Sequence, residues 1–146
     1  MIDRATLGMV AERHIDVWRG GDLSAASGLY ASSFTDHHPS DGQAPGAEGF
    51  LAARARLRSA LPDLDVTISE MLIDAPIVSI RWRMRGTHSE ADFEGAEAQG
   101  APVLVHGGDV IKVGADGLVT DLWHVEEVWK LRLQLAGPNP EAQPQP

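Results

Sequence analysis

The spacing of the apolar residues changes at Leu64, and this change limits the folds open to the chain. Before Leu64, apolar side chains such as Leu7, Val10 and Trp18 recur about every three to four residues, which is the spacing of helices packed on one side. After Leu64 they recur at every second residue, most clearly in "IVSIRWRMR", and this alternation is typical of strands with one buried face. The sequence therefore predicts helices first and a sheet second.

The expected elements follow from this spacing and from the turn residues between them. We expect helices that end at Gly20-Gly21, over 23–31 and over 47–61, strands over 64–73, 77–88 and 101–113, and a turn, a strand and a closing helix over 116–137. Residues 35–46 read as a loop, and the polar residues 89–101 as a loop or short helix that crosses the mouth of a pocket. This order predicts an α+β fold in which N-terminal helices enclose an apolar cavity on the concave face of a curved antiparallel sheet.

Length and charge restrict the classes of protein. A chain of 146 residues fits a single domain, over 1–137, followed by a Pro-rich tail over 138–146 that we expect to be disordered. The net charge of −9 disfavours nucleic acid and anionic membranes as partners. Without cysteine there is no disulfide and no thiolate site. The N-terminus has neither the pattern of a signal peptide nor that of a membrane span, so we expect a cytoplasmic protein.

The last hairpin brings an acid and an imidazole together. If "GADG" is a four-residue turn, Val113 faces Leu118 and Asp109 faces Leu122. His124 then lies diagonally beside Asp109 on the same face, at about 7–8 Å, where the two side chains meet directly or through one water. Such a pair in an apolar interior has the components of proton transfer. The alternative is a structural hydrogen bond near a strand end.

The loop "FTDHHPSDG" offers Asp36, His37 and His38. Adjacent histidines on an extended segment point to opposite sides, so at most one of them faces the pocket. His37, His124 and Asp109 would supply a set of metal ligands, but their spacing matches no known ligand signature, and we expect no metal. The chain also lacks the short motifs of nucleotide and cofactor sites, so we expect no cofactor.

Other polar residues have plainer explanations. We expect His14 to be a core histidine with one hydrogen bond, and His88 and His106 to lie at the rim or surface. Glu126 is expected in the first turn of the closing helix, where a carboxylate favours the positive end of the helix dipole. Tyr30 is expected either in the core or with its hydroxyl in the pocket.

Four stretches together resemble a known family: "VWRGGDLSAASGLYASSFTDHHP", "GAEGFLAARARLRSALPDLDVTI", "IRWRMRGTH" and "DGLVTDLWHVEEVWKLRLQLAG". In order and spacing they are similar to the SnoaL-like polyketide cyclases of the nuclear transport factor 2-like superfamily. The resemblance runs from the first helix to Gly137. It implies a cone-shaped α+β barrel around an apolar cavity, which assembles as a homodimer or homotetramer.

The resemblance also implies a chemistry. Cyclases of this family close a ring by intramolecular aldol condensation without metal or cofactor, with a cavity aspartate that takes and returns the proton and a histidine that assists. The loop histidine of the family matches His37, its aspartate falls on His124, and its assisting histidine falls on Asp109. Acid and imidazole are therefore exchanged in this chain.

The resulting hypothesis is a cofactor-free enzyme that applies general acid–base chemistry to a hydrophobic, carbonyl-bearing small molecule, as a polyketide cyclase or an isomerase does. His124 is the expected base, Asp109 its partner, and His37 a group that, with Tyr30, binds or polarises the carbonyl oxygen. The alternatives are a non-catalytic binding module, a hydrolase or dehydratase on the same fold, and a scaffold whose cavity is filled by aromatic side chains. Expected substrate-binding residues are Tyr30, Trp18, Trp82, Met84, Trp123 and Glu127.

Overall fold

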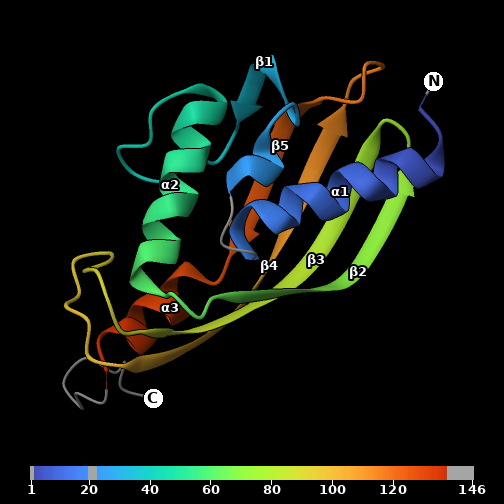
Figure 1. Ribbon diagram of the computed structural model, residues 1–146. Helices are drawn as coiled ribbons and strands as arrows, with labels where there is room; N and C mark the ends of the chain where they lie inside the picture. The colour runs from blue at the N-terminus through green and yellow to red at the C-terminus, as the bar shows by residue number, and fades with distance from the viewer. Residues whose placement is uncertain (1, 20–22, 138–146) are drawn as a thin grey trace.

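The computed structural model describes residues 2–19 and 23–137 and confirms the α+β class (Figure 1). Three helices and five strands follow one another along these residues, with one 3-10 turn. They are α1 (Arg4–Arg19), η1 (Leu23–Ala26), β1 (Tyr30–Asp36), α2 (Gly46–Ala60), β2 (Asp65–Asp74), β3 (Ile77–His88), β4 (Ala101–Val113), β5 (Val119–Glu126) and α3 (Val128–Leu135).

The strands form one sheet in the order β1-β5-β4-β3-β2. Strands β2 to β5 pair with antiparallel neighbours, whereas β1 runs parallel to β5. The sheet is therefore mixed: the four predicted strands pair antiparallel, as expected, and the strand that was not predicted, β1, adds a parallel edge. The parallel pair places the end of β1 beside the middle of β5, with Asp36 opposite Leu122.

The predicted second helix over 23–31 is also wrong. Only residues 23–26 form a helical turn, Gly28 takes a positive φ of 67°, and Tyr30 begins β1. Ala favours a helix and the stretch has no β-branched residue, so local propensity alone predicts a helix. Pairing with β5 decides the outcome, since the ring of Phe34 is buried from this strand.

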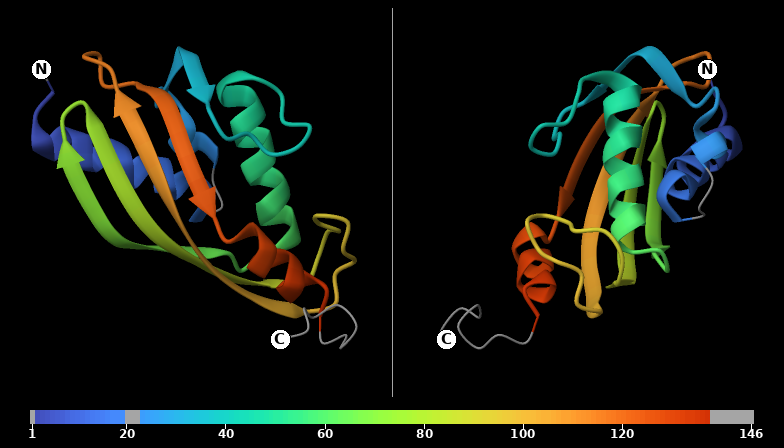
Figure 2. Two further views of the ribbon diagram at one scale, coloured as in Figure 1. Left: turned by 180° about the vertical axis from the view of Figure 1, so that it is seen from behind. Right: turned by 60° about the vertical axis from the view of Figure 1, so that its left-hand side comes forward.

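The helices α1 and α2 lie on the same face of the curved sheet, and α3 lies beyond the end of β5 (Figure 2). The predicted alternation in β3 is confirmed: Val78, Ile80, Trp82 and Met84 are buried, whereas the arginines between them are exposed. They belong to one buried cluster with the apolar side chains of α1, in which the rings of Trp82 and Trp18 meet edge to face. The core therefore lies between the helices and the inner face of the sheet.

The hairpin of β4 and β5 has a different register from the predicted one. Val113 pairs with Val119 and Asp109 with His124, because the register shifts by a residue between Lys112 and Val113 and the connection is longer than four residues. The predicted pairing of Asp109 with Leu122 is thus wrong by two residues. A shift of two residues preserves the face, so Asp109 and His124 still lie on the inner side of the sheet.

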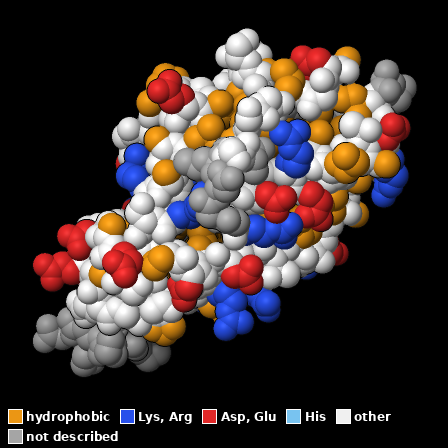
Figure 3. Space-filling view, in the orientation of Figure 1, with side chains coloured by type: hydrophobic (Ala, Val, Ile, Leu, Met, Phe, Trp, Pro, Cys, Tyr) orange, Lys and Arg blue, Asp and Glu red, His pale blue; other side chains and the backbone are white. Residues whose placement is uncertain are grey.

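Several predictions concern residues outside the described ones: the end of the first helix at Gly20-Gly21, and the tail over 138–146. Within residues 2–19 and 23–137, no helix is both long and apolar enough to cross a membrane. On the face shown in Figure 3, acidic and basic side chains lie beside one another between apolar ones. Charges of opposite sign also pair along α1, where Arg19 forms ion pairs with Glu12 and Asp16.

Candidate active site

A cavity of about 710 Å³ lies between α2, α3 and the inner face of β3, β4 and β5. Its apolar wall includes Trp18, Leu57, Trp82, Met84, Val105 and Leu131. The loop after β3 contributes residues 91–94 to the lining, as expected for a segment across a pocket mouth. The polar part of the wall contains His38, Arg54, His124 and Glu126. The cavity therefore combines an apolar volume with a compact group of ionisable side chains.

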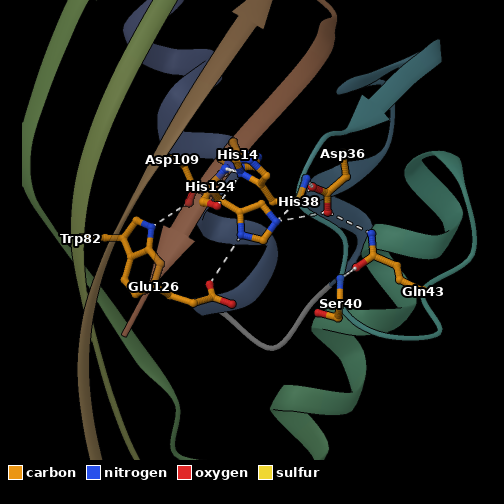
Figure 4. Close-up of polar contacts among 9 residues, drawn as sticks. All are labelled: His14, Asp36, His38, Ser40, Gln43, Trp82, Asp109, His124 and Glu126. Atoms are coloured by element: carbon orange, nitrogen blue, oxygen red, sulfur yellow. Dashed lines mark hydrogen bonds and ion pairs between the residues drawn. The ribbon is translucent and has the colours of Figure 1, made fainter. Parts of the chain in front are cut away.

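His124 is held between two carboxylates (Figure 4). Its Nε2 lies 3.0 Å from Oδ1 of Asp36, and its Nδ1 lies 3.5 Å from Oε2 of Glu126. The imidazole is only 5% exposed. Burial acts to lower its pKa, but the hydrogen bonds to Asp36 and Glu126 outweigh it and raise the pKa of His124 to about 9. The imidazole is thus a cation at neutral pH.

Asp36 is fixed by several donors at the end of β1. Its Oδ1 accepts the backbone N–H of His38 at 3.0 Å, and its Oδ2 accepts the side-chain amide of Gln43 at 2.9 Å. Burial acts to raise the pKa of Asp36, but the hydrogen bonds from His124 and Gln43 lower it to about 2. Asp36 is therefore ionised at neutral pH and orients one nitrogen of His124.

Glu126 is the most exposed member of this group at the cavity wall. It is the last residue of β5 rather than part of the closing helix, so the predicted dipole role is wrong. Its side chain is 25% exposed and lines the cavity. Burial acts to raise the pKa of Glu126, but His124 and the charge of Arg54 hold it below its ordinary value. An ionised carboxylate thus faces the cavity beside an imidazolium.

Of the two loop histidines, His38 and not His37 lines the cavity. The Nδ1 of His38 lies 2.7 Å from the carbonyl oxygen of His124, which fastens the loop to β5. His37 turns away, where it stacks on Trp123 with ring centroids 4.5 Å apart and lies 2.9 Å from Asp121. His37 and Trp123 are therefore placed outside the cavity lining, contrary to the predicted roles.

Asp109 belongs to a second, sealed group. Its Oδ2 lies 2.7 Å from Nε2 of His14, and its Oδ1 accepts the indole N–H of Trp82 at 2.8 Å. The hydroxyl of Tyr30 lies 2.8 Å from the other nitrogen of His14. The predicted contact of Asp109 with His124 is thus replaced by contacts with His14 and Trp82. His14 is a core histidine, as predicted, but with two hydrogen bonds rather than one.

The electrostatics of this second group follow from its burial. Burial acts to raise the pKa of Asp109, but His14 and Arg54 lower it below its ordinary value. Burial and the charge of Asp109 both raise the pKa of Tyr30. Neither Asp109 nor Tyr30 is among the residues that line the cavity. Their place is behind the wall, where Asp109 holds the ring of Trp82.

Gly107 allows Trp82 to form that wall. It pairs with Trp82 on one side and with Glu126 on the other. A Cβ at this position would lie 2.3 Å from the ring of Trp82 and 2.6 Å from the carbonyl oxygen of Val125. Only glycine leaves room for the indole to lie over the strand.

Arg54 of α2 lies on the opposite wall and is 8% exposed. Its guanidinium carbon lies 4.5 Å from the ring centroid of Trp18 and 5.0 Å from that of Phe50. The faces of these two rings attract the guanidinium through cation–π interactions and fix its position. Sequence spacing gave no sign of this residue, because "RARLR" reads as a row of exposed arginines.

The remaining predicted residues divide between cavity and surface. Glu127 lines the cavity, where it also accepts the backbone N–H of His106. His106 is exposed, as expected, whereas His88 is fully buried and lies 2.8 Å from the carbonyl oxygen of Ala91. Among the described residues, no three His, Asp or Glu side chains are grouped so as to hold a metal ion.

Asp36, Glu126 and Arg54 are the site residues that sequence reasoning missed; Glu126 was expected only near the positive end of a helix dipole. Asp36 had a signal, since it stands beside two histidines in a loop rich in Pro and Gly. Its partner is 88 residues away, however, and comes near only through the parallel pairing of β1 with β5. A local pattern does not reveal such a contact.

The curved sheet, with helices on one face and a cavity between them, is the fold of one class of protein. The chain belongs to the SnoaL-like polyketide cyclase family, whose model matches residues 8–135. No protein with curated annotation matches the sequence.

Several solved structures have the same fold and share about a fifth to a quarter of their residues with this chain. TsrD from Streptomyces laurentii is 22% identical with a TM-score of 0.82, over 92% of this chain and 98% of its own. A proposed polyketide cyclase from Bacillus cereus is 24% identical with a TM-score of 0.77, over 89% of this chain and 80% of its own. AclR, a proposed hydroxylase from Streptomyces galilaeus, is 20% identical with a TM-score of 0.79, over 94% of this chain and 89% of its own. At these identities the likeness shows the fold alone.

Proposed function

We propose that this protein is an enzyme that moves a proton on a hydrophobic, carbonyl-bearing small molecule, as in an aldol cyclisation or an isomerisation, without a metal or cofactor. One observation carries the proposal: His124 is clamped between Asp36 and Glu126, and Glu126 faces an apolar cavity. Groups of unlike protonation state, side by side at a cavity wall, are what general acid–base catalysis needs.

The geometry supports a division of roles that differs from the predicted one. His124 has a pKa of about 9 and is protonated at neutral pH, so it is a proton donor rather than the base. Glu126 is ionised and accessible from the cavity. We therefore assign the base to Glu126 and the acid to His124, with Asp36 as the residue that positions the imidazole.

The proton balance of such a step is simple. Glu126 takes the proton from a carbon next to a carbonyl group, the C–H electrons form the enolate, and the ion pair of Glu126 with His124 is lost. The Nδ1–H of His124 is then free to donate to a substrate oxygen. In a cyclisation the enolate carbon bonds to a second carbonyl carbon, whose oxygen takes the Nδ1 proton of His124. The proton held by Glu126 then passes to Nδ1 of His124. In an isomerisation the proton held by Glu126 is delivered to a different carbon of the substrate. Both outcomes leave the protein as it began.

The test is exchange of the acidic hydrogens of 2-tetralone, an apolar ketone, for deuterium in D₂O, followed by NMR. We expect wild type to accelerate the exchange, and Glu126→Gln to lose about 10²- to 10⁴-fold of that acceleration. The matched control is Glu70→Gln, an exposed carboxylate on β2 that pairs with Arg81 outside the cavity; it should exchange like wild type.

Two results would count against the proposal. Equal exchange by Glu126→Gln and wild type, with the fold intact by circular dichroism, would remove Glu126 as the base. Binding of 2-tetralone to wild type without any acceleration would favour the alternative of a non-catalytic binding module. The third alternative, a scaffold filled by aromatic side chains, is less favoured because Trp18, Trp82 and Met84 line an open volume.

A further inference from the structure

Arg54 is a buried cation without an acceptor. Its Nε is fully buried and has no hydrogen-bond partner among the described residues. No hydrogen bond or ion pair within residues 2–19 and 23–137 involves its guanidinium, although that group lies at the wall of the cavity. Buried arginines are normally paired, because each unmet N–H donor costs free energy.

The neighbours of Arg54 explain where its guanidinium lies, but they do not accept hydrogen bonds from its N–H groups. Trp18 and Phe50 contact the guanidinium by cation–π interactions, which hold its plane and accept no hydrogen bond in that plane. A guanidinium has five N–H donors in a fixed fork that matches two coplanar oxygens. The fork is thus oriented by the protein and left without oxygens.

Nearby carboxylates are already committed to other groups. Both oxygens of Asp109 are taken, one by His14 and one by Trp82. Asp36 is bonded to His124, His38 and Gln43. Glu126 lies beside the imidazolium of His124. The terminal N–H groups of Arg54, which unlike Nε are not fully buried, are therefore available to oxygens of a molecule in the cavity.

We infer that Arg54 is the anchor for a negatively charged oxygen group of the ligand, a carboxylate or an enolate, carried on an apolar body. The apolar body fits the wall of Trp18, Trp82, Met84 and Leu131. The two oxygens would meet the guanidinium in a bidentate pair, which is stronger and more directional than a single neutral hydrogen bond. The inference rests on the proposed function in taking this cavity as the ligand site.

This anchor gives the ligand a direction in the cavity. The anionic end lies at α2, against Arg54, and the rest of the molecule extends toward β5, where Glu126 and His124 stand. If the anchored group is an enolate oxygen, Arg54 also stabilises the charge that develops when Glu126 removes a proton.

The experiment compares two pairs of probes by isothermal titration calorimetry at mildly alkaline pH. The first pair is 2-naphthoate and its neutral analogue 2-naphthamide. The second is 1,3-indandione, which is an enolate under these conditions, and the neutral ketone 1-indanone. In wild type we expect the charged member of at least one pair to bind about 10- to 100-fold more tightly, the effect of one charge-assisted hydrogen-bonded pair. The pair with the larger preference identifies the anionic group.

Two variants separate Arg54 from general charge effects. Arg54→Met should abolish the preference, whereas Arg83→Met, which removes the same charge from the exposed side of β3, should keep it. Arg54→Lys keeps the charge without the fork and should bind at an intermediate level. No preference in wild type, or an equal preference in wild type and Arg54→Met, would overturn the inference. The wild-type comparison needs no variant and stands even if Arg54→Met fails to fold.

The binding data are independent of turnover. A charge preference lost in Arg54→Met without any acceleration of 2-tetralone exchange would support the anchor and contradict the proposed enzyme. Exchange that depends on Glu126, without any preference for the charged probes, would support the proposed enzyme and contradict the anchor.

Discussion

Two histidine–carboxylate groups lie on the inner side of the same sheet, and they differ in what surrounds them. His14 and Asp109 are 0% and 1% exposed, and every polar atom of the Asp109 carboxylate has a partner within the protein. His124 and Asp36 are nearly as buried, but a second carboxylate, that of Glu126, connects the imidazole to the cavity. The same pair of residue types is thus sealed in one place and open to a ligand in the other.

This difference teaches that burial and pairing alone do not mark a reactive group. A saturated pair gains stability from its mutual contacts and has nothing to offer a substrate. A pair with a third, partly exposed partner can change its contacts when a ligand arrives. Trp82 joins the two regions, since it bonds Asp109 at one end and forms part of the cavity wall.

The largest expected effect comes from a substitution in the buried group of Asp109, His14 and Trp82. Asp109→Leu leaves His14 and the indole N–H of Trp82 without their buried partner, and we expect the free energy of unfolding to fall by about 3–5 kcal/mol. Urea denaturation followed by tryptophan fluorescence measures the change. Asp121→Asn breaks the half-exposed pair with His37 and should cost only about 0.2–1 kcal/mol. Equal losses of unfolding free energy in the two variants would show that Asp109 contributes no more to stability than a half-exposed ion pair.

The next effect concerns the protonation of the group at the cavity wall, which consists of Asp36, His124 and Glu126. Because the pKa of His124 is raised from 6.5 to about 9, the folded state binds this proton more tightly than the unfolded state. The stability that it contributes is therefore complete below pH 6.5 and is lost as the pH rises through about 9. For Asp36 the sign is reversed: its pKa is lowered to about 2, so its contribution is present above its ordinary value of 3.8 and is lost as the pH falls toward 2.

Imidazole NMR titration checks this prediction directly. In wild type the His124 resonance should remain that of the cation through neutral pH, and in Asp36→Asn its midpoint should fall toward 6.5, its ordinary value. Asp121→Asn removes a carboxylate from the same strand without touching His124 and should leave the midpoint near 9. A wild-type midpoint below neutral pH would remove the basis for calling His124 the acid.

The smallest expected effect concerns the indole that joins the two groups. Gly107→Ala places a Cβ against the ring of Trp82 and the backbone of β5, and we expect it to cost about 1–3 kcal/mol and to shift the tryptophan emission. The neighbouring Gly108→Ala meets only the carbonyl oxygen of Ile80 at 3.4 Å and should change stability by less than about 1 kcal/mol. Similar losses at both positions would argue against a close approach specific to Gly107.

Much of the fold was predictable because it depends on local periodicity. The strands over 77–88 and 101–113 are found at the predicted residues. The strand β1 was missed because its sequence, "YASSFTD", has small polar residues where a strand usually has β-branched ones, and only Phe34 is fully buried. Its identity as a strand comes from pairing with β5.

The site was predictable only in part, for the same physical reason. His124 and Asp109 were expected on one face, and an even shift of register kept them there. Their partners come from elsewhere: His14 from α1, 95 residues from Asp109, and Asp36 from β1, 88 residues from His124. Periodicity reports which face a side chain occupies, but long-range packing decides what it touches.

The parallel pairing of β1 with β5 has a consequence for folding during synthesis on the ribosome. The carboxylate of Asp36 leaves the ribosome 88 residues before the imidazole that it bonds, and the strand that carries that imidazole is the last one of the sheet. A nascent chain that stops short of β5 has neither the edge on which β1 pairs nor a partner for Asp36. Contacts of such long range form late in folding. The sheet and the contact between Asp36 and His124 are therefore completed only after β5 has been synthesised.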